Sequence, residues 1–202
     1  MKLLWKLLLV LTIIIFIPLI TFRFLVFNLD FYEKEFTKLN VYDKFPKETA
    51  DENIKELISY LKNKDSLETD FFNEKEKQHL IDVKNLINKA ISLFYLTLFL
   101  LIIFLILNYK SLSKPFLYSG VSIIILIIIL LFLDFNQAFL NFHKLFFSND
   151  LWLLNPETDN LINLFPQQFF SDFIKKVFIN SFFISILLII SSFFLAKFEK
   201  KF

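Results

Sequence analysis

Four long apolar runs divide the sequence, and each is long enough to cross a lipid bilayer as a helix. They extend over residues 3–22, 90–107, 116–133 and 177–196. A spanning helix needs about 20 predominantly apolar residues, because its backbone finds no other hydrogen-bonding partner in hydrocarbon. Charged side chains stand only near the ends of the runs, which argues against a transporter pathway through them. We predict an all-α protein in which residues 1–202 form a single membrane domain with four transmembrane helices.

The first run begins like a secretory signal peptide, because Lys2 and Lys6 resemble the basic start of one. Its apolar stretch is too long for that role, however, and no small-residue cleavage site follows it. We therefore expect a retained membrane anchor.

The first long connection, residues 29–88, has helical patterns of its own. Within residues 51–63, apolar side chains recur at i, i+3, i+4 and i+7, the stripe of an amphipathic helix: Ile54, Leu57, Ile58 and Leu61. Asn73 followed by Glu76 has the form of a helix N-cap with a capping carboxylate. No Gly or Pro interrupts residues 74–108. This pattern predicts one long helix that enters the second span and carries His79 outside the membrane.

The second long connection, residues 134–176, has two parts. We expect residues 134–147 to continue the third span as a helix, with one face that holds Asn136, Leu140, His143 and Phe147. Pro156 and its polar neighbours then mark turns. Large aromatic side chains are favoured at the surface of a membrane. The rest of this connection is therefore predicted to be interfacial, with a belt of Trp152, Phe165, Phe169 and Phe170.

The distribution of lysines predicts how the chain is oriented. Lysines in short loops and tails remain on the cytoplasmic side, and here they flank the outer ends of the first and last runs and the short connection between the middle two: Lys2, Lys6, Lys110, Lys114, Lys197, Lys200 and Lys201. The connection 29–88 is acidic instead. We predict a multi-pass membrane protein with both termini cytoplasmic. The connections 29–88 and 134–176, and with them both histidines of the sequence, would be extracytoplasmic.

The composition excludes several kinds of chemistry. The absence of Cys rules out disulfides, a Cys nucleophile and thiolate metal sites. A single glycine, Gly120, rules out the glycine-rich loops that hold nucleotide phosphates. A net charge of +2 gives no sign of a nucleic-acid surface. We expect no nucleotide, no nucleic acid and no cofactor.

The remaining candidates for chemistry are the two histidines, His79 and His143. Asp82 follows His79 by one helical turn, where its carboxylate could contact the imidazole and orient it. A surface His beside an Asp is equally compatible with a structural role. Two other classes of protein also fit: a non-catalytic scaffold with partner-binding loops, and a metal-binding protein. The metal would need both histidines and one carboxylate from Asp82, Asp150 or Asp159.

Two stretches resemble the bacterial lipoprotein intramolecular transacylase family, formerly an uncharacterised family of integral membrane proteins. The first is the run from Gln78 to Lys84, which contains His79 and Asp82. The second runs from Phe142 to Trp152 and continues with residues 155–162 and 164–166. Its spacing of His, Phe-Phe, Asn-Asp, Trp, Pro and Asp carries the specific part of the resemblance. One departure is visible, because Gln167 and Gln168 follow Pro166 where members of the family carry an acidic residue.

The resemblance implies an acyltransferase reaction. The acyl ester at the second glycerol position of a diacylglyceryl-cysteine lipoprotein would move onto the α-amine of the same cysteine, which gives a lyso-form lipoprotein. It implies a diacylated lipoprotein as substrate and no metal. It also implies the lipid bilayer of the bacterial cytoplasmic membrane as surroundings, with the active site on the extracytoplasmic side. His79 and His143 would be catalytic, handling the proton of the amine and of the leaving oxygen. Supporting or substrate-positioning roles would fall to five residues: Asp82, Asn149, Asp150, Trp152 and Asp159.

Overall fold

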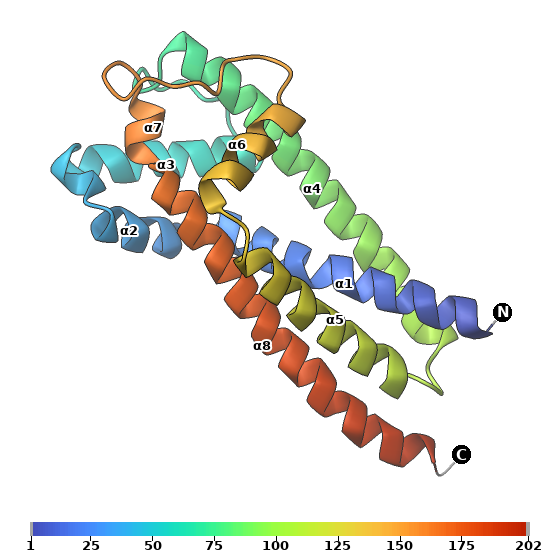
Figure 1. The fold of residues 1–202 in the computed structure, drawn as a ribbon. Helices are drawn as coiled ribbons and strands as arrows, with labels where there is room; N and C mark the ends of the chain where they lie inside the picture. The colour runs from blue at the N-terminus through green and yellow to red at the C-terminus, as the bar shows by residue number, and fades with distance from the viewer. Residues whose placement is uncertain (1, 201–202) are drawn as a thin grey trace. The chain divides into compact units, whose positions relative to one another are not determined.

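The computed structural model describes residues 2–200, which form helices and connections without a strand. Figure 1 shows the helices in chain order: α1 (Lys2–Val26), α2 (Leu29–Lys38), the 3-10 turn η1 (Val41–Asp43), α3 (Lys47–Leu61), α4 (Glu74–Leu107), α5 (Ser113–Leu131), α6 (Phe135–Phe146), α7 (Asn160–Leu164) and α8 (Gln167–Glu199). The chain forms two compact units. Unit 1 comprises Met1–Phe24, Ala90–Leu133 and Lys175–Phe202, and unit 2 comprises Leu25–Lys89 and Asp134–Ile174.

Unit 1 contains the apolar parts of α1, α4, α5 and α8, the four helices that are long and apolar enough to cross a membrane. The predicted runs lie within these helices, except that α5 ends at Leu131 and not at residue 133. Leu9, Ile13 and Ile17 recur along one face of α1 and pack with Phe104 of α4 and with Ile123 and Ile127 of α5. The all-α class and the four spans predicted from the sequence are therefore confirmed.

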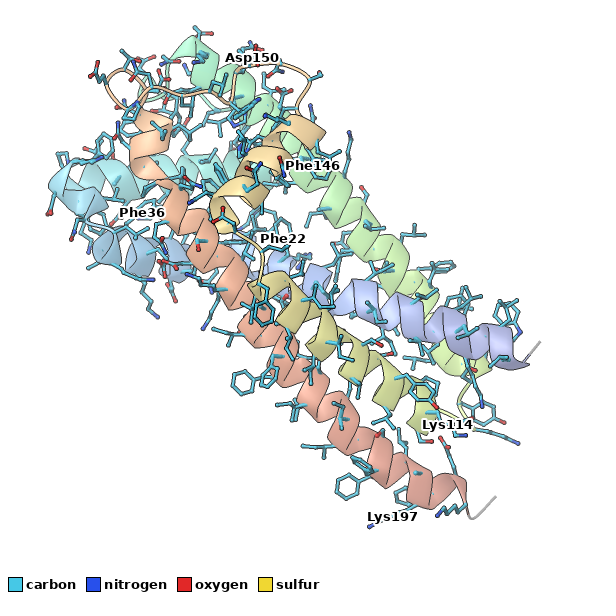
Figure 2. The ribbon with its side chains drawn as sticks, viewed as in Figure 1. Phe22, Phe36, Lys114, Phe146, Asp150 and Lys197 are labelled. Atoms are coloured by element: carbon cyan, nitrogen blue, oxygen red, sulfur yellow. The ribbon has the colours of Figure 1, made fainter. Side chains whose placement is uncertain are left out.

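The polar ends of these helices meet at one end of unit 1. The amide of Asn108 donates to the carbonyl of Trp5 at 3.3 Å, which joins the end of α4 to the start of α1. The carboxylate of Glu199 accepts from the backbone N–H of Ser113 at 2.8 Å, which joins the end of α8 to the start of α5. Figure 2 shows Lys114 and Lys197 at this same end. The lysine-bearing segments of the sequence are thus gathered together.

Gly120 lets α5 and α8 approach each other closely. A Cβ atom at this position would lie 2.8 Å from the carbonyl oxygen of Ser185 and 2.7 Å from Cγ1 of Ile189. Small residues at helix interfaces in membranes allow such backbone approach. The one glycine of the sequence therefore serves the close packing of two helices.

The first long connection forms most of unit 2. The predicted amphipathic helix is α3, in which Ile54, Leu57, Ile58 and Leu61 are all buried. Helix α2 was not predicted from the sequence. It begins where the side chain of Asn28 accepts from the backbone N–H of Phe31 at 3.2 Å. An Asn before a helix is a common N-cap, so this signal was present in the sequence.

The second long connection supplies the other half of the core of unit 2. Phe165 and Phe169 are buried and pack against Tyr32 and Phe36 of α2, with ring centroids 5.3–6.3 Å apart. Lys38 of α2 is also paired with Asp172 of α8 at 2.7 Å. Two of the four aromatic residues predicted to form an interfacial belt are therefore core residues, because α2 offers them an apolar partner. Phe170 remains exposed.

The predicted continuation of the third span through residue 147 is wrong. Helix α5 ends at Leu131, and α6 begins at Phe135 as a separate helix. The backbone of Asp134 is extended (φ −64°, ψ 119°), and its side chain accepts from the N–H of Gln137 at 2.8 Å. An Asp in this position caps a new helix, since its carboxylate satisfies an N–H that lacks a partner in the first turn.

The long helix predicted from residue 74 onward is confirmed as α4. Its 34 residues correspond to about 51 Å of helix, whereas the hydrocarbon core of a bilayer is about 30 Å thick. The charged first half, which belongs to unit 2, therefore extends beyond the apolar half. Helix α8 is also longer than its apolar run, because it begins at Gln167, directly after Pro166.

Candidate functional site

His79 lies on the second turn of α4, and a capping box fixes the start of that helix. The side chain of Asn73 accepts from the N–H of Glu76 at 3.0 Å, while the carboxylate of Glu76 accepts from the N–H of Asn73 at 2.7 Å. This reciprocal pair is the arrangement that the sequence predicted. The side chain of His79 is only 6% exposed, so it belongs to the interior of unit 2 and not to its surface.

His143 lies on the last turn of α6 and is half-buried. Its Nδ1 is 2.8 Å from the carbonyl oxygen of Phe139, one turn earlier on the same helix. A carbonyl oxygen can only accept, so Nδ1 carries the proton of the neutral ring and Nε2 keeps a lone pair. The indole of Trp152 lies against the ring, with centroids 5.0 Å apart. His143 is therefore oriented with a basic nitrogen available.

The two histidines lie side by side. Their ring centroids are 6.4 Å apart and their planes are inclined by 31°. Phe147 contacts both rings, at 5.0 Å from His79 and 5.5 Å from His143. Residues 64 positions apart in the chain are thus brought together beside one aromatic ring.

The surroundings keep both imidazoles neutral. Burial lowers the pKa of His79 to about 4, and the neighbouring His143 lowers it further than Asp82 raises it. Burial also lowers the pKa of His143, although its hydrogen bond to Phe139 acts in the opposite direction. An apolar environment disfavours the charged form of a side chain, and this is the general cause of such pKa shifts. At neutral pH both rings can therefore accept a proton.

Asp82 is near enough for its charge to raise the pKa of His79, but its hydrogen bond is made with another residue. Its carboxylate accepts a hydrogen bond from the amide of Asn149 at 2.9 Å, and it makes none with His79. Within residues 2–200, nothing hydrogen-bonds to the buried Nδ1 of His79. The oxygen of Asn149 accepts from the N–H of Leu151 at 3.1 Å. Asp82 and Asn149 therefore act as a pair that holds the start of the connection after α6 against α4.

Asp159 belongs to a second set of hydrogen bonds, which holds the end of that connection. Its side chain is buried and accepts from the amide of Asn73 at 2.9 Å and from the N–H of Asn155 at 2.7 Å. Lys75 lies 3.8 Å away and donates to the carbonyl of Leu153 at 2.5 Å. Asp159 is thus fully engaged in structure. Asp150, by contrast, is exposed on the same connection, as Figure 2 shows.

Glu76 makes contacts that were not predicted from the sequence. Its side chain is 1% exposed, and besides Asn73 it accepts from the N–H of Leu161 in the first turn of α7. Burial raises the pKa of Glu76, while the N–H donors offset part of that effect. The sequence identified Glu76 only as a helix cap, because the contact with α7 spans 85 residues. Glu76 joins the helix of His79 to the segment that positions Trp152 beside His143.

The metal-binding alternative lacks a ligand set in the part of the chain that the structure describes, where no three His, Asp or Glu side chains are gathered. Asp82 and Asp159 are occupied by hydrogen bonds to amides and backbone, and Asp150 points to solvent. The histidine pair therefore stands without a third ligand.

Gln168, one of the two residues that replace the expected acid, donates to Asp172 at 2.9 Å.

Fold and site together define a membrane-integral, all-helical protein with two adjacent neutral histidines, one buried and one half-buried. The sequence profile of the lipoprotein intramolecular transacylase family matches residues 7–170. The chain belongs to this family and is an acyltransferase. Among curated proteins, none matches.

Solved structures agree with this assignment. The lipoprotein intramolecular transacylase Lit from Bacillus cereus is 27% identical, with a TM-score of 0.89 over 98% of this chain and 97% of that one. Two variants of that protein, each with one histidine replaced, match with TM-scores of 0.84 and 0.85 at 26% identity, over 98% of this chain and 93% and 95% of theirs. The likeness extends over both units of the chain.

Replacing Glu76 should loosen the connection after α6. In Glu76→Gln, only one side-chain oxygen remains to accept from two backbone N–H groups, and a buried donor without a partner costs about 1–3 kcal/mol. We expect a lower unfolding temperature and altered emission from Trp152, measured in a Trp5→Phe background where Trp152 is the sole tryptophan. Glu74→Gln, at an exposed neighbour, is the control. Equal effects of the two changes would contradict the role of Glu76.

The two histidines should titrate below the ordinary value of about 6.5. NMR of the imidazole protons gives two signals, which a His143→Gln variant assigns, and that of His79 should have its midpoint near 4 because the ring is buried. An unfolded chain would take up this proton near pH 6.5, so stability should fall as the pH drops from about 6.5 to about 4. A midpoint of 6.5 for His79 would show that its ring is solvated.

Proposed function

We propose that this chain moves an acyl group within a diacylated lipoprotein, with His79 and His143 as the catalytic residues. The acyl chain would leave the second glycerol oxygen and join the α-amine of the same cysteine, giving the lyso-form. Membership of the transacylase family supports the reaction. The observation that carries the assignment of residues is the pair of neutral imidazoles 6.4 Å apart.

The reaction needs a base and an acid but no nucleophile from the protein. An α-amine with a pKa of about 7.7–8.0 is mostly protonated at pH 7 and first loses one proton to solvent. As its nitrogen attacks the ester carbonyl, one histidine takes the second proton, and a proton is then returned to the glycerol oxygen. The C–N bond forms, the C–O bond breaks, and the proton balance closes. This division of work suits two adjacent histidines, since imidazole accepts and donates near neutral pH.

Either histidine could begin as the base. The carbonyl of Phe139 keeps the proton of His143 on Nδ1, so the lone pair on Nε2 is free. Proton transfer to His143 is therefore directed to Nε2. If His79 takes the proton of the attacking amine instead, its lowered pKa makes the resulting imidazolium a strong acid, which suits the return of that proton to the leaving oxygen. Holding amine and ester in one bound molecule would contribute further, because intramolecular reactions in good geometry reach effective molarities of about 10⁵–10⁸ M.

Supporting roles are proposed for the residues around the pair. Asp82 and Asn149 would keep the connection after α6 in place, and Asp159 would do the same at its other end. Trp152 would hold the ring of His143. Asp150, exposed on this connection, is free to contact the charged amine of the lipoprotein.

The test is mass spectrometry of a reporter lipopeptide produced together with this protein. Fragment ions must place the acyl chain, since migration from oxygen to nitrogen leaves the mass unchanged. We expect N-acylation with the intact protein and a loss of about 10²–10⁴-fold in His79→Ala and His143→Ala, the usual contribution of acid–base catalysis. Asn141→Ala, an exposed polar position on α6, is the control. Full N-acylation by both histidine variants would overturn the assignment.

We also propose that both termini are cytoplasmic, in a bacterial cytoplasmic membrane, and that the histidine pair faces the outside. The gathering of the lysine-bearing ends of unit 1 supports this orientation, because positive loops remain in the cytoplasm.

Orientation can be tested cleanly because the chain has no Cys. In intact cells, a membrane-impermeant maleimide should label Ser66→Cys, which lies in the exposed connection before α4. It should not label Ser111→Cys, between α4 and α5, until the cells are opened. The reverse pattern would mean that the site faces the cytoplasm.

A further inference from the structure

Helix α6 leaves a stripe of apolar side chains uncovered. None of its 12 residues is buried. Ala138, Phe142 and Leu145 recur at i, i+4 and i+7, so they lie on one face, with Phe146 beside them. Phe142 is 43% exposed, Leu145 77% and Phe146 51%. Figure 2 labels Phe146 on this helix. Large apolar side chains gathered in this way on one helix mark a surface that something covers.

The other faces of α6 differ from this stripe. Phe139 and His143 are half-buried and contact each other and, through His143, the rings of Phe147 and Trp152. A polar face lies on the other side of the stripe and consists of Gln137, Asn141 and Lys144, all exposed. The helix therefore has three faces: one packed against the rings around His143, one apolar and exposed, and one polar.

A short connection joins α6 to the membrane-crossing helix α5. Helix α5 is one of the membrane-crossing helices and ends at Leu131, and α6 begins at Phe135. Three residues separate the two helices, and an extended segment of three residues spans at most about 10 Å. Two of them, Phe132 and Leu133, are 86% and 56% exposed and continue the apolar surface of α5. The start of α6 is thus tied to the edge of the hydrocarbon.

We propose that α6 lies in the surface of the membrane, with Phe142, Leu145 and Phe146 inserted among the lipid chains. A helix with an apolar face, a polar face and a lysine is of the kind that lies at this depth, with its apolar side buried about 5–10 Å. The aromatic belt predicted from the sequence is accordingly displaced. Phe165 and Phe169 are in the core, and α6 provides the lipid-facing aromatic rings instead.

This placement has a consequence that rests on the proposed function. The ester of a diacylglycerol lies where the headgroup meets the acyl chains. A helix lying at that level holds His143 at the depth of the ester, so the substrate need not leave the bilayer. The same insertion would keep the ring of His143 away from water, in line with its lowered pKa.

The experiment uses the full chain, in which an introduced Cys is the only one. Leu145→Cys and Asn141→Cys, on the apolar and polar faces, are each labelled with an environment-sensitive fluorophore and placed in vesicles of phosphatidylethanolamine and phosphatidylglycerol. Phe146→Cys repeats the apolar position. One quencher is a phospholipid with a nitroxide high on its acyl chain, and the other is aqueous iodide. The readout does not depend on acyl transfer, so it remains valid if the proposed function fails.

We expect the nitroxide lipid to quench the probes at residues 145 and 146 several-fold more than the probe at residue 141, and iodide to show the opposite order. Equal access of iodide to all three positions would mean that the stripe faces water, and would overturn the proposal. Protection of residues 145 and 146 from both quenchers would overturn it as well, because a protein surface, such as a second copy of the chain, would then cover the stripe.

Discussion

The buried carboxylate of Glu76 is the point on which the site depends. It receives the backbone N–H of Asn73 at the start of its own helix and that of Leu161 at the start of α7. A buried charge is tolerated only when it is well hydrogen-bonded, so both donors must be present for the carboxylate to stay there. The first and second long connections are joined by this group. Without it, Trp152 and Asn149 would lose one of the two anchors of their segment.

The chemistry of the histidine pair follows from the same packing. Folding the second connection over α4 encloses His79 and brings Phe147 against both rings. Enclosure removes water, and loss of water favours the neutral imidazole. A base that is neutral at the working pH is what acyl transfer to an amine requires. The aromatic side chains, which are abundant throughout the sequence, have a specific use here.

The two units are packed in different ways. In unit 1, small residues such as Gly120 allow α5 and α8 to pack closely, while apolar side chains of α1 fill the space between helices. Unit 2 has a core of clustered aromatic rings, and an ion pair between the exposed Lys38 and Asp172 lies at its surface. Helix α6 stands apart from both patterns, because it contributes no buried residue to either core.

Sequence by itself determined the features that depend on neighbours along the chain. The four spans follow from apolar runs, the long helix α4 from the absence of Gly and Pro, and α3 from its stripe of buried residues, since a helix is built from contacts three and four residues apart. The family resemblance named both histidines, but spacing could not show that they meet.

Only the tertiary structure decided which distant residues share a partner. It assigned Asp82 to Asn149, Glu76 to Leu161, and Phe165 to the core, each through a contact between segments far apart in sequence. It also separated α6 from α5, where the carboxylate of Asp134 satisfies the first turn of a new helix in a stretch whose apolar pattern suited one continuous helix. The periodicity of apolar residues along the chain does not reveal such contacts. Many partners satisfy the same local pattern, and packing selects among them.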